Sequence, residues 1–339
     1  MLYGHGDDSY KYGNIKANFS SNIYGKTDLS GLYRHLSARM ACLTAYPEPE
    51  PASLETQLAA TYGLQPDEVC VTNGATEAIY LIAQAFRDRK SYILQPTFSE
   101  YADACRLHAH TVKPVYSINA IDGNADLVWL CNPNNPTGEV RPENTLMTLI
   151  KSHPSVCFVI DQSYEDYTYK SLFSAAKAVE MSQVILLHSA AKRYAIPGLR
   201  LGAVTAPAAL LQQIRRQRMP WSVNAMAIEA GYFFLQNRPL PPAFTDDLLK
   251  ETERLRNAVE NLKIADVWPT DTHFFLLRLR IGKSGLLKKY LAEEHHILIR
   301  DASNFEGLND TFIRIATQTQ EENNLLIKAL EEWKITFTC

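Results

Sequence analysis

Residues 188–202 read HSAAKRYAIPGLRLG and follow directly on the apolar run Val184–Leu187. The stretch contains one lysine, Lys192, with Ser189 before it and Arg200 after it. A lysine here could be an ordinary solvated surface residue or a nucleophile at the end of a buried strand. The choice depends on what the neighbouring strands carry at the same edge of the sheet.

The middle of the chain alternates short apolar runs with helical stretches. Runs that are apolar at nearly every position are typical of strands buried on both faces, and helices between them indicate a mainly parallel sheet. The predicted strands are Tyr92–Leu94, Thr111–Val115, Leu127–Cys131, Cys157–Asp161, Val184–His188 and Leu201–Thr205. The predicted helices run from Gly74 to about Phe86, from Pro142 through Ile150, and over Ala208–Arg216.

After about residue 236 the pattern changes to that of a smaller α+β unit. Its predicted elements are a long helix Pro241–Leu262, a strand His273–Leu279, a helix Gly285–His295, strands Ile297–Arg300 and Phe312–Ala316, and a helix Glu321–Trp333. The first thirty or so residues are polar and irregular. We therefore expect an N-terminal arm (1–30) that packs on the small domain and active site, a large domain (31–236) and a small domain (237–339).

Composition excludes several classes of protein. The net charge is −3, so no basic field indicates a nucleic-acid or membrane partner, and no apolar run is long enough to span a bilayer. The N-terminal residues MLYGHGDDSYKYG do not resemble a signal peptide, and the six cysteines include no C-x-x-C pair. These features predict a cytoplasmic protein with reduced cysteines.

Three motifs for common ligands fail. Gly282-Lys283-Ser284 lacks the leading glycine of a P-loop, because position 277 is Leu277. No G-x-G-x-x-G follows a strand, which leaves a nicotinamide dinucleotide site without support. His295-His296 lacks the H-E-x-x-H spacing, so we expect no metal site.

Polar motifs follow three other predicted strands at the point where each strand ends. They are Asn73-Gly74-Ala75-Thr76, Asn132-Pro133-Asn134-Asn135-Pro136-Thr137-Gly138, and Asp161-Gln162-Ser163-Tyr164. Each has an ordinary explanation: a helix cap, a turn and a second helix cap. Open α/β sheets nevertheless bind ligands at this edge, and a helix N-terminus favours an anion.

Taken together with Lys192, these motifs resemble the fold-type I pyridoxal-phosphate enzymes, the aspartate-aminotransferase superfamily. The matching segments are NGATE, NPNNPTG, DQSYEDY and SAAKRYAIPGLRLG, and the resemblance covers the chain from about Ala17 to Trp333. It implies a large domain that binds pyridoxal 5'-phosphate, with a mainly parallel seven-stranded sheet flanked by helices, and a smaller α+β domain.

The resemblance also implies a role for each matching residue. Lys192 would bind the cofactor covalently and move protons, and Asp161 would pair with the pyridinium nitrogen. The remaining cofactor contacts would be Asn135 and Tyr164 on the phenolic oxygen, Phe98 on the ring face, and Gly74, Ala75, Thr76, Ser189 and Arg200 on the phosphate. Tyr46 matches a tyrosine that reaches the phosphate of the partner subunit, which implies a homodimer with shared active sites.

Two subfamilies share this layout: histidinol-phosphate aminotransferases and the threonine-phosphate decarboxylases of cobalamin synthesis. In both, Arg300 would hold the substrate phosphate, Arg314 the substrate carboxylate, and Asn135 would lie beside the substrate. The pair His5-Gly6 and the residue Asn22 resemble substrate contacts of the decarboxylases. We therefore favour decarboxylation of L-threonine-O-3-phosphate, with a histidinol-phosphate or related aminotransferase as the alternative.

Several residues depart from the family pattern, so the identity of the substrate stays open. Asp7 and Asp8 would repel a phosphate unless they point away from it. Gln162 replaces a common glutamate, and His273 stands where an asparagine is usual. The residue types also leave open whether the bond broken is Cα–H or Cα–COO⁻. A non-catalytic protein that kept the fold is a third hypothesis, which the presence of Lys192 and Asp161 disfavours.

Overall fold

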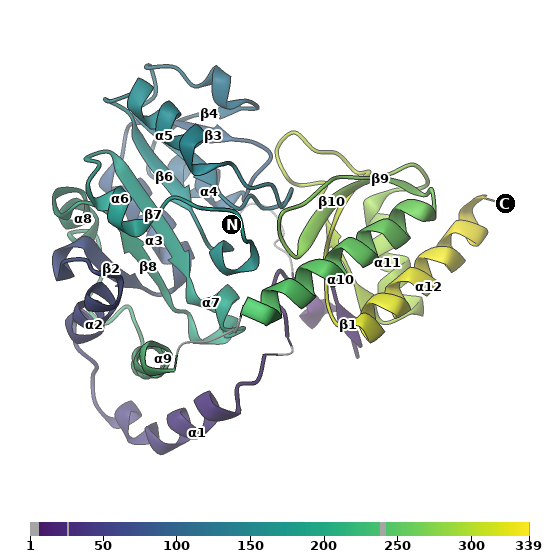
Figure 1. The fold of residues 1–339 in the computed structure, drawn as a ribbon, viewed down its shortest axis with the longest axis horizontal. Coiled ribbons are helices and arrows are strands. Elements are labelled where there is room, and N and C mark those ends of the chain that lie inside the picture. Colours follow the sequence, from purple (N-terminus) through teal and green to yellow (C-terminus); the bar gives the residue numbers. More distant parts are fainter. Residues whose placement is uncertain (1–6, 26, 238–241, 339) are drawn as a thin grey trace.

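The computed structural model describes residues 7–25, 27–237 and 242–338, and its large sheet has the order β2-β8-β7-β6-β5-β3-β4 (Figure 1). The strands are β2 (Val69–Thr72), β3 (Lys90–Leu94), β4 (Thr111–Val115), β5 (Leu127–Cys131), β6 (Cys157–Asp161), β7 (Val184–Ser189) and β8 (Gly202–Thr205). Pairing is parallel from β7 through β4, and only the two pairs made by β8 are antiparallel. The predicted mainly parallel seven-stranded sheet is confirmed.

Apolar side chains on both faces explain why the central strands are hydrophobic at every position. In β5, Trp129 packs into one core cluster while Val128 and Leu130 pack into another on the opposite face. The helices of this unit are α1 (Ser30–Ala38), α2 (Ala52–Tyr62), α3 (Gly74–Ala85), α4 (Glu100–Leu107), α5 (Glu143–Ser152), α6 (Ala175–Val179), α7 (Ala190–Arg193), α8 (Ala208–Arg215) and α9 (Ala225–Gln236). Of these, α3 and α4 contribute to the first cluster and α5 to the second.

The strand Thr111–Val115 departs from the expectation of burial on both faces. As β4 it lies at the edge of the sheet, and only Val115 is buried. An edge strand lacks a neighbour on one side, which leaves its polar side chains in contact with solvent.

The second unit contains a four-stranded antiparallel sheet of order β12-β13-β10-β9. Its elements are α10 (Pro242–Asn261), β9 (Ala265–Val267), β10 (Phe274–Leu279), α11 (Ser284–Glu294), β12 (Arg300–Asp301), β13 (Phe312–Ala316) and α12 (Gln320–Thr338). Figure 1 shows α10 running from the large sheet across this unit. Apart from the strand Ile297–Arg300, the predicted elements are present, although β10 begins one residue later and α12 is longer at both ends.

The single predicted strand Ile297–Arg300 is wrong. Ile297–Leu298 forms β11, which pairs in parallel with β1 (Ala17–Asn18) of the N-terminal segment, whereas Arg300 belongs to β12. The chain changes partner at Ile299 because the N-terminal segment occupies the earlier part of the run. Phe19, next to β1, is fully buried in the core of the small unit. The domain boundaries at residues 30 and 236 stay a prediction.

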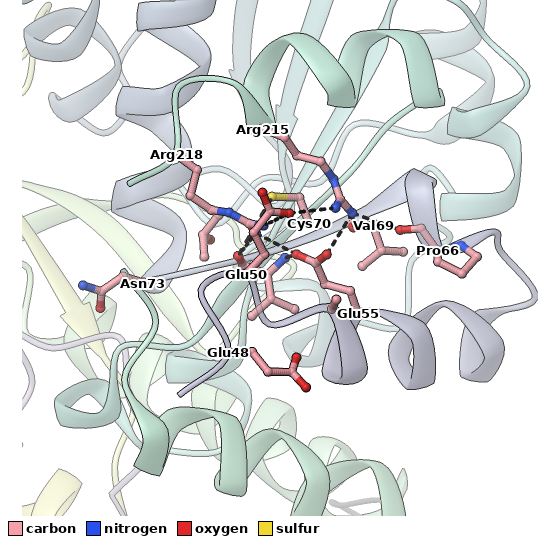
Figure 2. Close-up of polar contacts among 12 residues, drawn as sticks. Glu48, Glu50, Glu55, Pro66, Val69, Cys70, Asn73, Arg215 and Arg218 are labelled. Carbon is pink, nitrogen blue, oxygen red and sulfur yellow. Dashed lines mark hydrogen bonds and ion pairs between the residues drawn. The ribbon is translucent and has the colours of Figure 1, made fainter. Parts of the chain in front are cut away.

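Side chains rather than another strand cover the free edge of β2 (Figure 2). Glu55 of α2 accepts the backbone N–H of Val71 at 2.9 Å, and the Arg218 guanidinium donates to the Val71 carbonyl at 3.1 Å. Glu55 also pairs with Arg218 at 2.7 Å and with Arg215 at 2.9 Å. Glu55 and Arg218 are almost completely buried, so each charge depends on the other.

Across the described residues, no helix is both long and apolar enough to cross a bilayer. The cysteines Cys70, Cys105, Cys131 and Cys157 are buried free thiols, and Cys42 is partly exposed.

We predict that Glu55→Ala lowers the free energy of unfolding by about 3 kcal/mol, since it removes the buried carboxylate shared by Arg215 and Arg218 and leaves Arg218 with the exposed Glu50 alone. Glu55→Gln should cost less, because its amide oxygen can still accept the Val71 N–H. Urea unfolding followed by circular dichroism measures both. A loss smaller than about 1 kcal/mol, the value of an exposed pair, in Glu55→Ala would contradict a structural role for this edge cover.

Candidate active site

A cavity of about 610 Å³ lies where β5, β6 and β7 end, and both units and the N-terminal segment line it. The large unit contributes Ala75, Thr76, Phe98, Asn135, Asp161, Tyr164, Ser189, Lys192 and Arg200. The N-terminal segment contributes Asp7 and residues 20–22, and the small unit contributes Arg300, Asn304, Phe305 and Arg314. Most residues predicted from the sequence for the site are thus brought to one cleft.

Lys192 lies in the short helix α7, directly after β7. Burial, together with the positive charges of Arg314 and Arg200, lowers the pKa of its amine to about 8, and Asp161 and Asp7 oppose this shift. Its Nζ atom lies 6.0 Å from the centre of the Tyr164 ring. A lysine of this pKa has a substantial neutral, nucleophilic fraction near pH 8. Lys192 is therefore no ordinary solvated lysine.

The carboxylate of Asp161 is fixed at the end of β6 by two donors. The Tyr101 hydroxyl donates to Oδ2 at 2.6 Å, and the backbone N–H of Ser163 donates to Oδ1 at 2.8 Å. Tyr101 itself stacks on Trp129, with ring centres 5.7 Å apart. The carboxylate is thus buried and oriented, and it can hold a positively charged ring nitrogen.

An anion cradle forms at the N-terminus of α3. The cap residue Asn73 makes no side-chain capping bond there, and the Arg200 guanidinium packs against Gly74, whose φ of +77° favours glycine. A Cβ at Gly202 would lie 2.6 Å from the backbone nitrogen of Ala75. Glycine is required at both positions, and the backbone N–H groups together with the guanidinium fit a phosphate.

Two buried arginines face each other across the small sheet. Arg300 of β12 and Arg314 of β13 are register partners, and both are at most 8% exposed. Arg314 donates to the side-chain oxygen of Asn135 and to the carbonyl of Ser20. Among the described residues no carboxylate pairs with Arg314, and its Nε has no hydrogen-bond partner.

Like charges directly opposite on neighbouring strands destabilise a sheet, and a buried cation needs a counter-charge. Arg300 is partly compensated by the Asp301 carbonyl at 2.6 Å and the Asn304 side chain at 2.7 Å. The pair is consistent with a site for an anionic ligand.

The side chains of the two arm aspartates, Asp7 and Asp8, point to different places. Asp8 points to Lys288 of α11, with both carboxylate oxygens 2.8 Å from Nζ. Asp7 lines the cleft, and its carboxylate accepts from the Asn18 amide at 2.7 Å. Only Asp8 therefore points away from a bound anion. The predicted contacts His5 and Gly6 lie outside the described residues.

Tyr46 is the predicted residue that the single chain does not bring to the cleft. It is 85% exposed, and its ring lies 5.3 Å from that of Trp221. Its reach toward a partner subunit stays a prediction.

Sequence reasoning missed Tyr101 and Tyr167, which hold Asp161 and the Lys192 carbonyl respectively. Neither belongs to a motif that marks it, although Tyr167 ends the segment DQSYEDY. No group of three or more His, Cys, Asp or Glu side chains is placed to hold a metal ion in the described part of the chain.

The observed groups fit pyridoxal 5'-phosphate: a nucleophilic lysine, a buried carboxylate for the ring nitrogen, and a phosphate cradle. Asn22, buried at the cleft with neither amide atom bonded in the described structure, adds polar groups for a ligand.

Comparisons with known proteins agree with this geometry. The family model for aminotransferase class I and II matches residues 15–330. A threonine-phosphate decarboxylase of Salmonella typhimurium is 30% identical, over 92% of this chain and 89% of that protein. The crystal structure of L-threonine-O-3-phosphate decarboxylase from Porphyromonas gingivalis is 39% identical, with a TM-score of 0.90 over 94% of this chain and 99% of that one.

A histidinol-phosphate aminotransferase of Archaeoglobus fulgidus is 28% identical, over 85% of this chain and 84% of that protein. The family match covers nearly the whole chain and includes every strand of the seven-stranded and the four-stranded sheet. The chain belongs to the class I and II aminotransferase family.

Proposed function

We propose that this chain is a pyridoxal-phosphate enzyme that decarboxylates L-threonine-O-3-phosphate, with Lys192 as its catalytic residue. The observation that carries the proposal is the pair Arg300 and Arg314, buried side by side in the cleft that contains Lys192. Two adjacent buried guanidinium groups favour a substrate with two anionic groups. Threonine phosphate carries the carboxylate and the phosphate in one molecule, whereas histidinol phosphate has the phosphate alone and would leave Arg314 to the carboxylate of the amino donor.

The cofactor-binding residues divide into four sets. Lys192 would provide the amine, Asp161 would pair with the ring nitrogen, and Tyr164 and Asn135 would hydrogen-bond the phenolic oxygen. The phosphate belongs in the cradle of Gly74, Ala75, Thr76, Ser189 and Arg200. Pyridoxal phosphate, when bound, supplies an electron sink adjacent to the substrate Cα.

The protein's own residues select the bond that breaks. Arg314 holds the carboxylate and Arg300 the phosphate, so the pose of the substrate is fixed from two sides. The bond held perpendicular to the cofactor ring is the one that overlaps its π system, and small changes of pose alter this choice. After loss of CO2, the Lys192 ammonium returns a proton to Cα.

A histidinol-phosphate aminotransferase is the second candidate, because a protein of that name matches most of this chain. It would use the same cofactor contacts. Arg314 would then hold the carboxylate of the amino donor or 2-oxo acid.

We further propose that the enzyme is a cytoplasmic homodimer. Tyr46 is largely exposed, and its ring lies beside that of Trp221. The side chains of Trp221 and Met219 are exposed as well. A second copy that covers this region would bring Tyr46 to a neighbouring phosphate cradle.

We predict that the purified protein releases CO2 from threonine phosphate without any 2-oxo acid. Arg314→Met should raise KM roughly 100-fold, the effect of removing one partner of a buried charge contact. The control is Arg278→Met on the same sheet, because Arg278 is exposed and pairs with Asp266. Its kinetics should be nearly those of the wild type.

The opposite result would be turnover of histidinol phosphate that requires 2-oxoglutarate, with no CO2 from threonine phosphate. That result would replace the decarboxylase by the aminotransferase and leave the cofactor assignment in place.

We also predict that the apoprotein couples covalently to pyridoxal phosphate and that the rate of coupling rises with pH. The midpoint of this pH profile should lie near 8, the pKa of Lys192. Below this pH the amine is protonated and unreactive, and above it the neutral form attacks. Arg314→Met should move the midpoint upward, because it removes a positive charge that lowers this pKa.

Borohydride reduction and mass spectrometry follow the coupling. Lys192→Ala is the blank and should yield no reduced adduct. A midpoint near that of an unperturbed lysine, about 10.4, would contradict the assigned environment.

A further inference from the structure

His273 is a buried polar side chain without an evident function. It precedes β10, is 0% exposed, and its backbone carbonyl accepts from the Thr317 N–H at 2.8 Å. Neither ring nitrogen has a hydrogen-bond partner in the described structure. Most buried polar atoms in proteins are paired, so an imidazole that leaves two nitrogens unbonded requires an explanation.

One neighbour of the imidazole leads to the reactive lysine. The ring centres of His273 and Tyr167 are 3.9 Å apart, with an interplanar angle of 35°. The Tyr167 hydroxyl donates to the backbone carbonyl of Lys192 at 2.7 Å. The imidazole therefore packs directly on the residue that holds the Lys192 backbone.

The other neighbour leads to the substrate side of the cleft. Burial, Arg314 and Lys192 lower the pKa of His273 to about 3, and a contact with the Asn22 backbone opposes this shift. The ring is neutral at any working pH, with one donor and one acceptor nitrogen. Asn22 belongs to the arm, is 2% exposed, and has neither amide atom bonded in the described structure.

We propose that His273 is a positioning residue: its imidazole lies beside the arm at the Asn22 backbone, and its ring packs on Tyr167, which holds the Lys192 backbone. Substrate contacts made by Asn22 and the position of Lys192 then depend on one side chain. The proposal rests on the cofactor chemistry proposed at Lys192 and is independent of which phosphorylated substrate the enzyme uses.

Two variants separate the two contacts. His273→Phe keeps a flat ring on Tyr167 and removes both nitrogens. Loss of the polar imidazole beside the Asn22 backbone should raise the KM for the substrate roughly five- to tenfold. The absorbance of the bound cofactor changes with pH, and we call the pH at which this change is half complete the absorbance midpoint. The kcat value and the absorbance midpoint should stay as in the wild type, because the Tyr167 contact is retained.

His273→Asn keeps polar atoms and removes the ring from Tyr167. Water that enters beside Tyr167 would hydrate the protonated nitrogen at Lys192, so the absorbance midpoint should rise by about half a unit or more, and kcat should fall. All variants keep the same charged and titratable groups around Lys192. These groups are Arg314, Arg200, Asp161, Asp7 and Tyr164.

The matched control is His110→Phe. His110 is also a buried histidine, but its ring nitrogens are bonded to the Ser91 hydroxyl and the Ala83 carbonyl at 2.8 Å, and it does not line the cleft. This variant should lower the thermal unfolding temperature without changing KM or the absorbance midpoint.

The proposal is overturned if both His273 variants lose stability while KM, kcat and the midpoint stay unchanged, because His273 would then be core packing alone. A change in KM without a change in the midpoint of His273→Asn overturns the link to Lys192. Failure of the wild type to release CO2 from threonine phosphate tests the proposed substrate instead. KM is then measured with aminotransferase substrates, and the midpoint needs no substrate. A protein that binds no cofactor contradicts both proposals.

Discussion

The burial of three cationic side chains, Lys192, Arg300 and Arg314, in one cleft is the constraint on which the site depends. Burial, together with the positive charges of Arg314 and Arg200, lowers the pKa of Lys192 to about 8. Among these three, Arg314 is bonded in the described structure to neutral oxygens, those of Asn135 and Ser20, and to no carboxylate. Charge compensation is thereby left to an anionic ligand, and binding energy becomes available for orientation.

This compensation also explains why three distant segments meet at one point. The carbonyl of Ser20 comes from the arm, Asn135 from the turn after β5, and Arg314 from the small sheet. The pairing of β1 with β11 anchors the arm, and the Asp8–Lys288 ion pair holds it at Asp8. A displacement of any of the three segments moves the substrate relative to Lys192, which is how remote packing can decide between two reactions of the same cofactor.

Local patterns were sufficient to predict the central strands and the residues at their carboxyl ends. Leu127–Cys131 and Cys157–Asp161 have the bounds expected from their apolar runs, because burial on both faces leaves a continuous hydrophobic signal. The register of Arg300 opposite Arg314, the bond from Tyr101 to Asp161 and the edge cover made by Glu55 were not predictable. Each joins residues far apart in sequence, and a single chain without aligned relatives carries no local trace of such pairs.

The most direct test of the two-arginine site is a crystal structure of Lys192→Ala with pyridoxal phosphate and threonine phosphate. Without the lysine amine the substrate can bind but not complete turnover. We expect the substrate carboxylate on Arg314 and its phosphate on Arg300, with the Cα–carboxylate bond perpendicular to the cofactor ring. A substrate phosphate bound away from Arg300, or a Cα–H bond in the perpendicular position, would contradict the account.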